Sequence, residues 1–155
     1  MPQKFLTIEQ LENTEYYYGG MWADSVKLTK GEYYHEDPSM TNRFSVLMDE
    51  LKATGDLDGD GQIDAVVILN ENGATGPGTR YFVPVLNQGG VPVSQEAYAI
   101  SRSPISLIAI EDGILTVESA RHRDGDGNCC PSQLVREMFE FEDGRLNSVS
   151  FEELN

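Results

Sequence analysis

The sequence has few basic residues. Its 155 residues include 11 Lys and Arg against 26 Asp and Glu, so the formal net charge is −15. Proteins bind nucleic acid by pairing Lys and Arg with phosphate groups, and anionic membrane surfaces attract the same residues. The charge therefore argues against nucleic acids and anionic membranes as partners, and it favours cations.

Long apolar runs are also lacking. A transmembrane helix needs about 20 consecutive apolar residues, and no segment of this sequence approaches that length. The N-terminal residues MPQKFLTIEQ lack the apolar stretch and the small-residue cleavage site of a signal peptide. From the residues alone we expect no membrane-spanning segment, and either a cytoplasmic protein or a mature fragment given a start Met.

Cysteines and catalytic motifs are scarce as well. The only two cysteines, Cys129 and Cys130, are adjacent, which is not the spacing of a disulfide framework. The sequence contains no phosphate-binding glycine loop, no G-x-S-x-G and no H-E-x-x-H. We therefore predict that the protein is not an enzyme.

What remains is the composition of one globular domain. The apolar fraction of 39% and the charged fraction of 24% are ordinary for a folded protein. The length fits a single domain over residues 1–155, because domains have roughly 100–200 residues. Near the N-terminus, Thr7-Ile8-Glu9-Gln10 has the form of a capping box and predicts a short helix from Thr7 to about Tyr16.

The remainder of the chain predicts about eight strands. Ala65–Leu69 is wholly apolar and rich in β-branched residues, as in a central strand buried on both faces. Pro84 cannot donate to a ladder, so its strand is expected at an edge or at a bulge. Two hairpins are expected at Asp112-Gly113 and Asp143-Gly144. The candidate strand segments, nine in all, are Ser25–Lys30, Phe44–Ala53, Ala65–Leu69, Arg80–Asn87, Val91–Tyr98, Ile105–Ile110, Ile114–Glu118, Leu134–Phe141 and Arg145–Phe151. The fold class is a mainly β, antiparallel sheet with a short N-terminal helix, and a mixed α+β sheet is the alternative.

An acidic loop precedes the Ala65–Leu69 strand. Asp56, Asp58, Asp60 and Asp64 stand at positions 1, 3, 5 and 9 of a Ca²⁺-loop pattern, with Gly61 at position 6. Alternate side chains of a tight loop point toward one centre, and a glycine permits the sharp turn. With the Gln62 carbonyl and waters, these oxygens supply the 6–8 ligands at about 2.3–2.6 Å that Ca²⁺ takes. Mg²⁺ is less suited, because it demands stricter octahedral geometry.

The loop is not that of an EF-hand. Position 12, where an EF-hand has a bidentate Glu, is Val67, and a strand is expected to follow in place of a helix. The arrangement resembles the Ca²⁺ loops at strand starts in FG-GAP-type repeat proteins. The charge supports a cation independently of the motif. From Asp49 to Asp64 six acidic residues face one lysine, which gives a local charge of −5. A solvated acidic turn is the alternative.

A second loop has a shorter version of the same pattern. Asp124, Asp126 and Asn128 place oxygens at positions 1, 3 and 5, but Cys129 replaces the glycine at position 6. We treat this loop as a weak candidate for a second ion, with a flexible glycine-rich loop as the alternative.

The adjacent cysteines leave several possibilities open. Cys129 and Cys130 can form a strained disulfide, remain free thiols, or ligate a metal with His35 or His122. A disulfide or thiol pair would also suit a redox protein, which is the alternative to a cation-binding domain. A third hypothesis is a ligand- or partner-binding module that uses the aromatic residues between Tyr16 and Trp22 and the Gly73–Thr79 loop. A core role for these aromatic residues is the alternative.

Several of these segments occur together in a known family. In order, the chain has GDLDGDGQIDAVVIL, a glycine-rich loop, YFVPVLNQGGVPV, SLIAIEDGILTVE and CCPSQ. This order resembles the LppP/LprE-type lipoproteins and their cyanobacterial relatives, over residues 11–146. The resemblance implies a non-catalytic cell-envelope domain that is periplasmic, cell-surface or secreted. The chain departs from the family at Ser101–Pro104, where a Gly-Asp-Arg segment is usual, and at Arg123–Asn128, which is more acidic.

The sequence therefore predicts a non-enzymatic extracytoplasmic domain that binds a structural Ca²⁺ ion. The expected ligands are Asp56, Asp58, Asp60, the Gln62 carbonyl and Asp64. The residues identify no protein or small-molecule partner and no oligomeric state.

Overall fold

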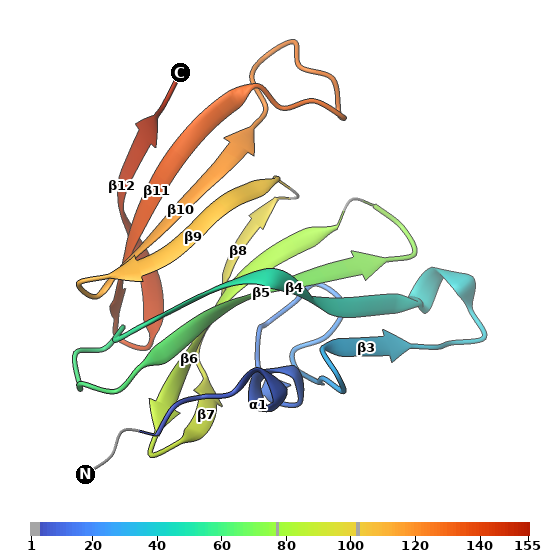
Figure 1. Cartoon of the computed structure of the whole chain (residues 1–155). Helices are drawn as coiled ribbons and strands as arrows, with labels where there is room; N and C mark the ends of the chain where they lie inside the picture. The colour runs from blue at the N-terminus through green and yellow to red at the C-terminus, as the bar shows by residue number, and fades with distance from the viewer. Residues whose placement is uncertain (1–3, 77, 102) are drawn as a thin grey trace.

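The structure is a computed structural model that describes residues 4–76, 78–101 and 103–155 (Figure 1). Three expectations extend beyond these residues: the first three residues of the N-terminal segment, Pro77 of the glycine-rich loop, and Arg102 of the SRSP segment. Within the described part of the chain, no helix is long and apolar enough to cross a membrane.

The fold is mainly antiparallel β, as the sequence predicts. The largest sheet has the order β3 (Glu32–His35), β4 (Phe44–Gly55), β5 (Asp64–Gly73), β6 (Thr79–Gln88) and β7 (Val91–Ser94), and β8 (Tyr98–Ser101) also pairs with β6. A second sheet is a meander of β9 (Ile105–Glu111), β10 (Ile114–Arg121), β11 (Gln133–Glu142) and β12 (Arg145–Glu153). The N-terminal segment contributes helix α1 (Ile8–Glu12) and the short pair β1 (Glu15–Tyr16) and β2 (Val26–Lys27). A 3₁₀ turn, Met40–Asn42, precedes β4.

Strand β5 lies between two hydrophobic cores. All five residues from Ala65 to Leu69 are at most 1% exposed, which confirms a central strand buried on both faces. Successive side chains of a strand point to opposite faces. Accordingly, Ala65, Val67 and Leu69 belong to one core, while Val66 and Ile68 belong to the other.

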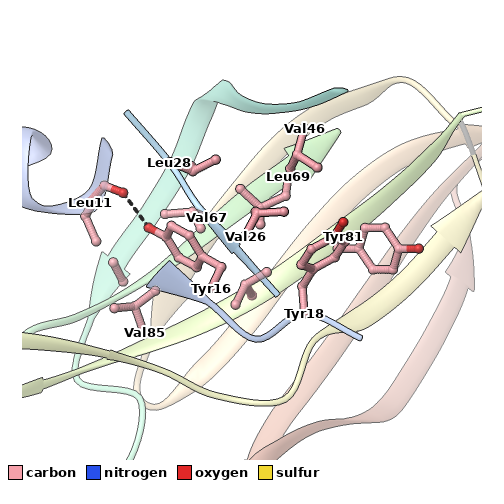
Figure 2. Packing of buried hydrophobic residues seen from close by; sticks show 12 residues of the cluster. Leu11, Tyr16, Tyr18, Val26, Leu28, Val46, Val67, Leu69, Tyr81 and Val85 are labelled. Carbon is pink, nitrogen blue, oxygen red and sulfur yellow. Dashed lines mark hydrogen bonds between the residues drawn. The ribbon is translucent and has the colours of Figure 1, made fainter. Parts of the chain in front are cut away.

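The first core packs the N-terminal segment against the large sheet (Figure 2). Tyr16 is fully buried there, and its hydroxyl donates a 2.7 Å hydrogen bond to the Leu11 carbonyl at the end of α1. Tyr18 is 3% exposed, and Trp22 stacks on Phe44 with ring centroids 5.9 Å apart. Tyr16 and Tyr18 therefore have the core role, and the hypothesis of an aromatic ligand platform receives no support from their positions.

The second core lies between the large sheet and the four-stranded sheet. Phe82 of β6 meets Phe139 of β11 edge to face, with centroids 6.2 Å apart. The two sheets lie in close contact beside the acidic loop, where a Cβ atom on Gly55 would lie 2.7 Å from Ile110 Cγ2. Leu57, inside the loop, is 4% exposed and belongs to the same core.

The N-terminal helix is shorter than predicted. The capping box is confirmed: Thr7 is the N-cap, and Gln10 supplies the reciprocal hydrogen bond. The predicted end near Tyr16 is wrong, because the helix ends at Glu12 and Tyr16 pairs with Val26 in a strand. In an extended conformation the Tyr16 side chain enters the core, so tertiary packing outweighs helix propensity at this end.

The expected edge position of the Pro84 strand is also wrong. Strand β6 is interior, with β5 on one side and both β7 and β8 on the other. β8 pairs with Thr79–Phe82 and β7 with Val85–Gln88, so Pro84 lies between the two ladders. The Pro84 carbonyl accepts from Gln95 N on that side, and the nitrogen of the same residue points the same way. The N–H group that proline lacks would point into the gap between β7 and β8. Its absence therefore removes no hydrogen bond between β6 and β5.

The two hairpins predicted at Asp112-Gly113 and Asp143-Gly144 are confirmed. The prediction of about eight strands is too low, since the described residues form twelve. Asp112 and Asp143 have φ of 50° and 56°, and each is followed by a glycine with positive φ, as in a tight two-residue turn. The expected strand Val91–Tyr98 is two strands, β7 and β8, because the chain leaves the edge of β6 beside Pro84. Two strands lie outside the expected ones: β1 falls in the segment predicted as helix, and β3 falls in a segment with no predicted strand.

We expect Gly55→Ala to destabilise the protein by about 1–3 kcal/mol, because the added methyl group would overlap Ile110 at the sheet junction. Urea unfolding followed by tyrosine and tryptophan fluorescence measures the change. Gly127→Ala is the matched control, since a Cβ there meets only Cys129 Sγ at 3.7 Å. Equal stability of the two variants would contradict the close approach of the sheets.

Candidate metal centre

The acidic loop connects β4 to β5 at one end of their hairpin. The ladder closes at the Gly55–Asp64 pair, so residues 56–63 form the loop and Asp64 begins β5. Gly59 and Gly61 have φ of 79° and 85°, in the left-handed region that disfavours residues with a Cβ. Gly61 therefore permits the predicted sharp turn, and Gly59 permits a second one that the sequence pattern did not single out.

The loop brings four carboxylates together. One oxygen each from Asp56, Asp58, Asp60 and Asp64 can be chosen so that all lie within 4.8 Å of one another, and the four residues could hold a metal ion. Asp58 and Asp60 are exposed, Asp56 is half-buried and Asp64 is fully buried. The group is thus open to solvent on one side and anchored in the protein on the other.

Asp64 is the anchor of the loop. Its Oδ2 accepts from Leu57 N and its Oδ1 accepts from Asn87 N, each at 2.8 Å, and the residue is 0% exposed. The carboxylate therefore ties the start of the loop and strand β6 to the first residue of β5. Each oxygen retains a further lone pair, so these two hydrogen bonds leave coordination possible.

The other carboxylates shape the loop from within. Asp56 accepts from Gly59 N and Gly61 N, both at 2.8 Å, and Asp60 accepts from Gln62 N at 2.8 Å. These hydrogen bonds hold the backbone of the loop in tight turns around the four carboxylates. Gln62 lies in these turns, and its carbonyl as a ligand stays a prediction.

The crowding has an electrostatic consequence at Asp58. Partial burial, a hydrogen bond to the Asp60 side chain and the charges of Asp64 and Asp60 together raise the pKa of Asp58 to about 6. Burial and the neighbouring carboxylates thus both disfavour a negative charge at this position. A bound cation would oppose this effect.

The structure agrees with the loop not being an EF-hand. Val67, at position 12, is fully buried in β5, where it pairs with Lys52 and Val83. β5 follows the loop directly, and the candidate centre is therefore built on a β-hairpin.

The second acidic loop has a different organisation. Asp126 accepts hydrogen bonds from the backbone N–H groups of Arg123 and Ser132, and its oxygens also accept from the Ser132 hydroxyl. These bonds lower the pKa of Asp126. Asp126 thus closes the β10–β11 loop, and a second ion with Asp124 and Asn128 stays a prediction.

Cys129 and Cys130 form a disulfide with each other. Among the alternatives left open by the sequence, this is the vicinal disulfide. Its sulfur atoms are not available as thiolates, so zinc ligation with His35 or His122 does not occur in this form. His122 is exposed, with Nε2 3.3 Å from the Asn128 carbonyl oxygen, and His35 stacks on Phe44.

Asn87 is the contributor to this region that sequence analysis missed. It is 1% exposed, and besides the bond to Asp64 its Nδ2 donates to the Lys4 and Ile63 carbonyls and its Oδ1 accepts from Gly90 N. The sequence signal that could have identified Asn87 is its place as a polar residue at the end of the apolar run YFVPVL. Asn87 links the loop to the N-terminal segment and to the β6–β7 turn.

No protein-family model, curated protein or solved structure matches the chain. The resemblance to the LppP/LprE-type lipoproteins stays a prediction, and the site is interpreted from the geometry of this chain.

We expect Asp64→Asn to cost about 1–3 kcal/mol in EDTA, because an amide has one acceptor oxygen where two buried backbone N–H groups now bind. Chemical unfolding measures the loss. Asp143→Asn makes the same charge change in an exposed turn whose positive φ suits Asn. Indistinguishable stabilities for the two variants would show that the Asp64 bonds contribute little.

The raised pKa of Asp58 predicts a pH dependence in EDTA. The folded protein holds the Asp58 proton up to a pH of about 6, while the unfolded chain releases it near the ordinary aspartate pKa of 3.8. The Asp58 contribution to stability is therefore present below pH 3.8 and lost as the pH rises to about 6. Relative to Asp58→Asn, the wild-type Tm should fall across this window. A constant difference between the two Tm values would contradict the shift.

Proposed function

We propose that the protein is a non-enzymatic extracytoplasmic domain that binds one structural Ca²⁺ ion between the acidic loop, residues 56–63, and Asp64 at the start of β5. The observation that carries the proposal is that four carboxylates at the Ca²⁺-loop spacing offer oxygens within 4.8 Å of one another. The positive φ angles of Gly59 and Gly61 give the loop the sharp turns that this arrangement needs. Asp56, Asp58 and Asp60 would each offer a carboxylate oxygen, Gln62 its carbonyl, and Asp64 would bind directly or through water.

The donor set favours Ca²⁺ over other common ions. Every candidate ligand is an oxygen, which disfavours zinc, since structural zinc sites use mainly Cys and His. Two of the four carboxylates are exposed on a surface loop, an arrangement that tolerates the variable geometry of Ca²⁺ better than the octahedral demand of Mg²⁺.

The ion would stabilise the junction of the two cores. Asp64 starts β5, whose side chains enter both cores, and Leu57 of the same loop packs between the sheets. Neutralising the repulsion in the loop would therefore stabilise the strand on which both cores depend. At a free Ca²⁺ concentration of 100 times Kd, binding adds about 2.7 kcal/mol to the free energy of unfolding.

The proposed location has two supports. The first is the resemblance of the sequence to cell-envelope lipoproteins. The second is the Cys129–Cys130 disulfide, because disulfides persist in oxidising compartments and are rare in the cytosol. We place the domain at the cell surface, in the periplasm or outside the cell, where it would act as an interaction or ligand-binding module.

A thermal-shift titration tests the cation site. Saturating Ca²⁺ should raise the Tm above its value in EGTA by about 5–10 °C, given the binding contribution and the size of the chain. The Asp58→Ala/Asp60→Ala variant should lose the shift, because it removes two ligands that make no buried hydrogen bond. Asp112→Asn/Asp143→Asn, with the same charge change in two exposed turns of positive φ, should keep it.

Two outcomes would contradict the proposal. One is a Tm that is the same in Ca²⁺ and EGTA. The other is an equal Ca²⁺ response in both double variants, which would show that the ion acts on the net charge and not at the loop.

A further inference from the structure

The Cys129–Cys130 disulfide lies in the connection between β10 and β11, which extends beyond the ends of its sheet (Figure 1). Both cysteines are exposed. We propose that this bond is a thiol–disulfide exchange site that reacts with a dithiol reductant. The proposal concerns a different loop from the acidic one and does not depend on Ca²⁺ binding.

A stabilising role does not account for this disulfide. Disulfides stabilise proteins mainly by closing loops in the unfolded chain, and the effect grows with loop length. Here the two cysteines are separated by one position, so the bond closes almost no loop and joins no two elements. Since both residues are exposed, the bond also completes no core.

The surrounding loop is held by other contacts. Asp126 binds Arg123 N and Ser132, Cys130 N donates to Gly127 O at 3.0 Å, and Asn155 Nδ2 donates to Ser132 O at 3.0 Å. None of these bonds uses a sulfur atom. The loop can therefore keep its frame when the disulfide opens, which is the condition for a reversible reaction.

Adjacency makes the bond easy to reduce. The two Cα atoms are 3.7 Å apart, as a trans peptide requires, whereas ordinary disulfides have about 4.4–6.8 Å between them. Disulfides outside the usual geometry, and disulfides exposed to solvent, are the more reducible and labile ones. Cys129–Cys130 is both adjacent and exposed, so a thiolate can reach a weakened bond.

The reaction balances with one dithiol. A thiolate of the reductant attacks one cysteine sulfur, the Cys129–Cys130 bond breaks, and the other cysteine leaves as a thiolate that takes a proton from water. The second thiol of the reductant loses its proton and attacks the reductant's own first sulfur in the mixed disulfide. This step closes the reductant's disulfide and releases the remaining protein cysteine as a thiolate. Two electrons pass to the protein, and the reductant becomes a disulfide.

Reduction kinetics by dithiothreitol, read by alkylation and intact mass, test the proposal. The folded protein should gain two labels at a rate within about threefold of that in guanidinium chloride, because an exposed bond is not protected by folding. The Tm of the reduced protein and of Cys129→Ser/Cys130→Ser should stay within about 2 °C of the oxidised protein, since the bond restricts the unfolded chain so little.

Reduction more than about tenfold slower in the folded protein would overturn the proposal, because it would show a protected bond. A Tm loss of more than about 6 °C in both the reduced protein and the double variant would also overturn it, since it would assign the disulfide a structural role. The same measurement with thioredoxin, a protein dithiol with a Cys-x-x-Cys motif, distinguishes a protein reductant from a small-molecule thiol. Faster reaction with thioredoxin supports exchange with a protein, and faster reaction with dithiothreitol supports exchange with small thiols.

Discussion

The fold depends on one buried carboxylate at the start of its central strand. Asp64 is fully buried, and its two oxygens accept the backbone N–H groups of Leu57 and Asn87. A buried carboxylate is costly unless it is hydrogen-bonded, so these bonds are a condition for β5 to begin where it does. Because Leu57 lies in the acidic loop and Asn87 in β6, the same group joins the candidate metal centre to the interior of the large sheet.

This position connects the acidic loop to both hydrophobic cores. Strand β5 supplies side chains to the core under the N-terminal segment and to the core under the four-stranded sheet. Asn87 continues the connection, because its side chain binds the Lys4 carbonyl of the N-terminal segment and Gly90 of the β6–β7 turn. A cation that relieves the repulsion among the loop carboxylates would thus act where both cores and the N-terminal segment meet.

Much of this could be predicted from the sequence, where the signal is local. The Asp spacing, the buried run Ala65–Leu69 and the two Asp-Gly turns each depend on residues close together in the chain. The helix end, the interior position of β6 and the role of Asn87 depend on partners far away in the sequence. Tyr16 leaves the helix to enter a core, and Pro84 is tolerated because two short strands share the edge of β6. The disulfide required the folded loop, since adjacent cysteines alone allow several states.

A crystal structure grown in CaCl₂ tests the central claim most directly. The account predicts one ion bound by oxygens of Asp56, Asp58 and Asp60, the Gln62 carbonyl, and Asp64 or its water, at about 2.3–2.6 Å with 6–8 ligands. It also predicts that the Asp64 bonds to Leu57 N and Asn87 N persist beside the ion. A loop that shows no anomalous signal and no density for an ion at millimolar Ca²⁺ would contradict it.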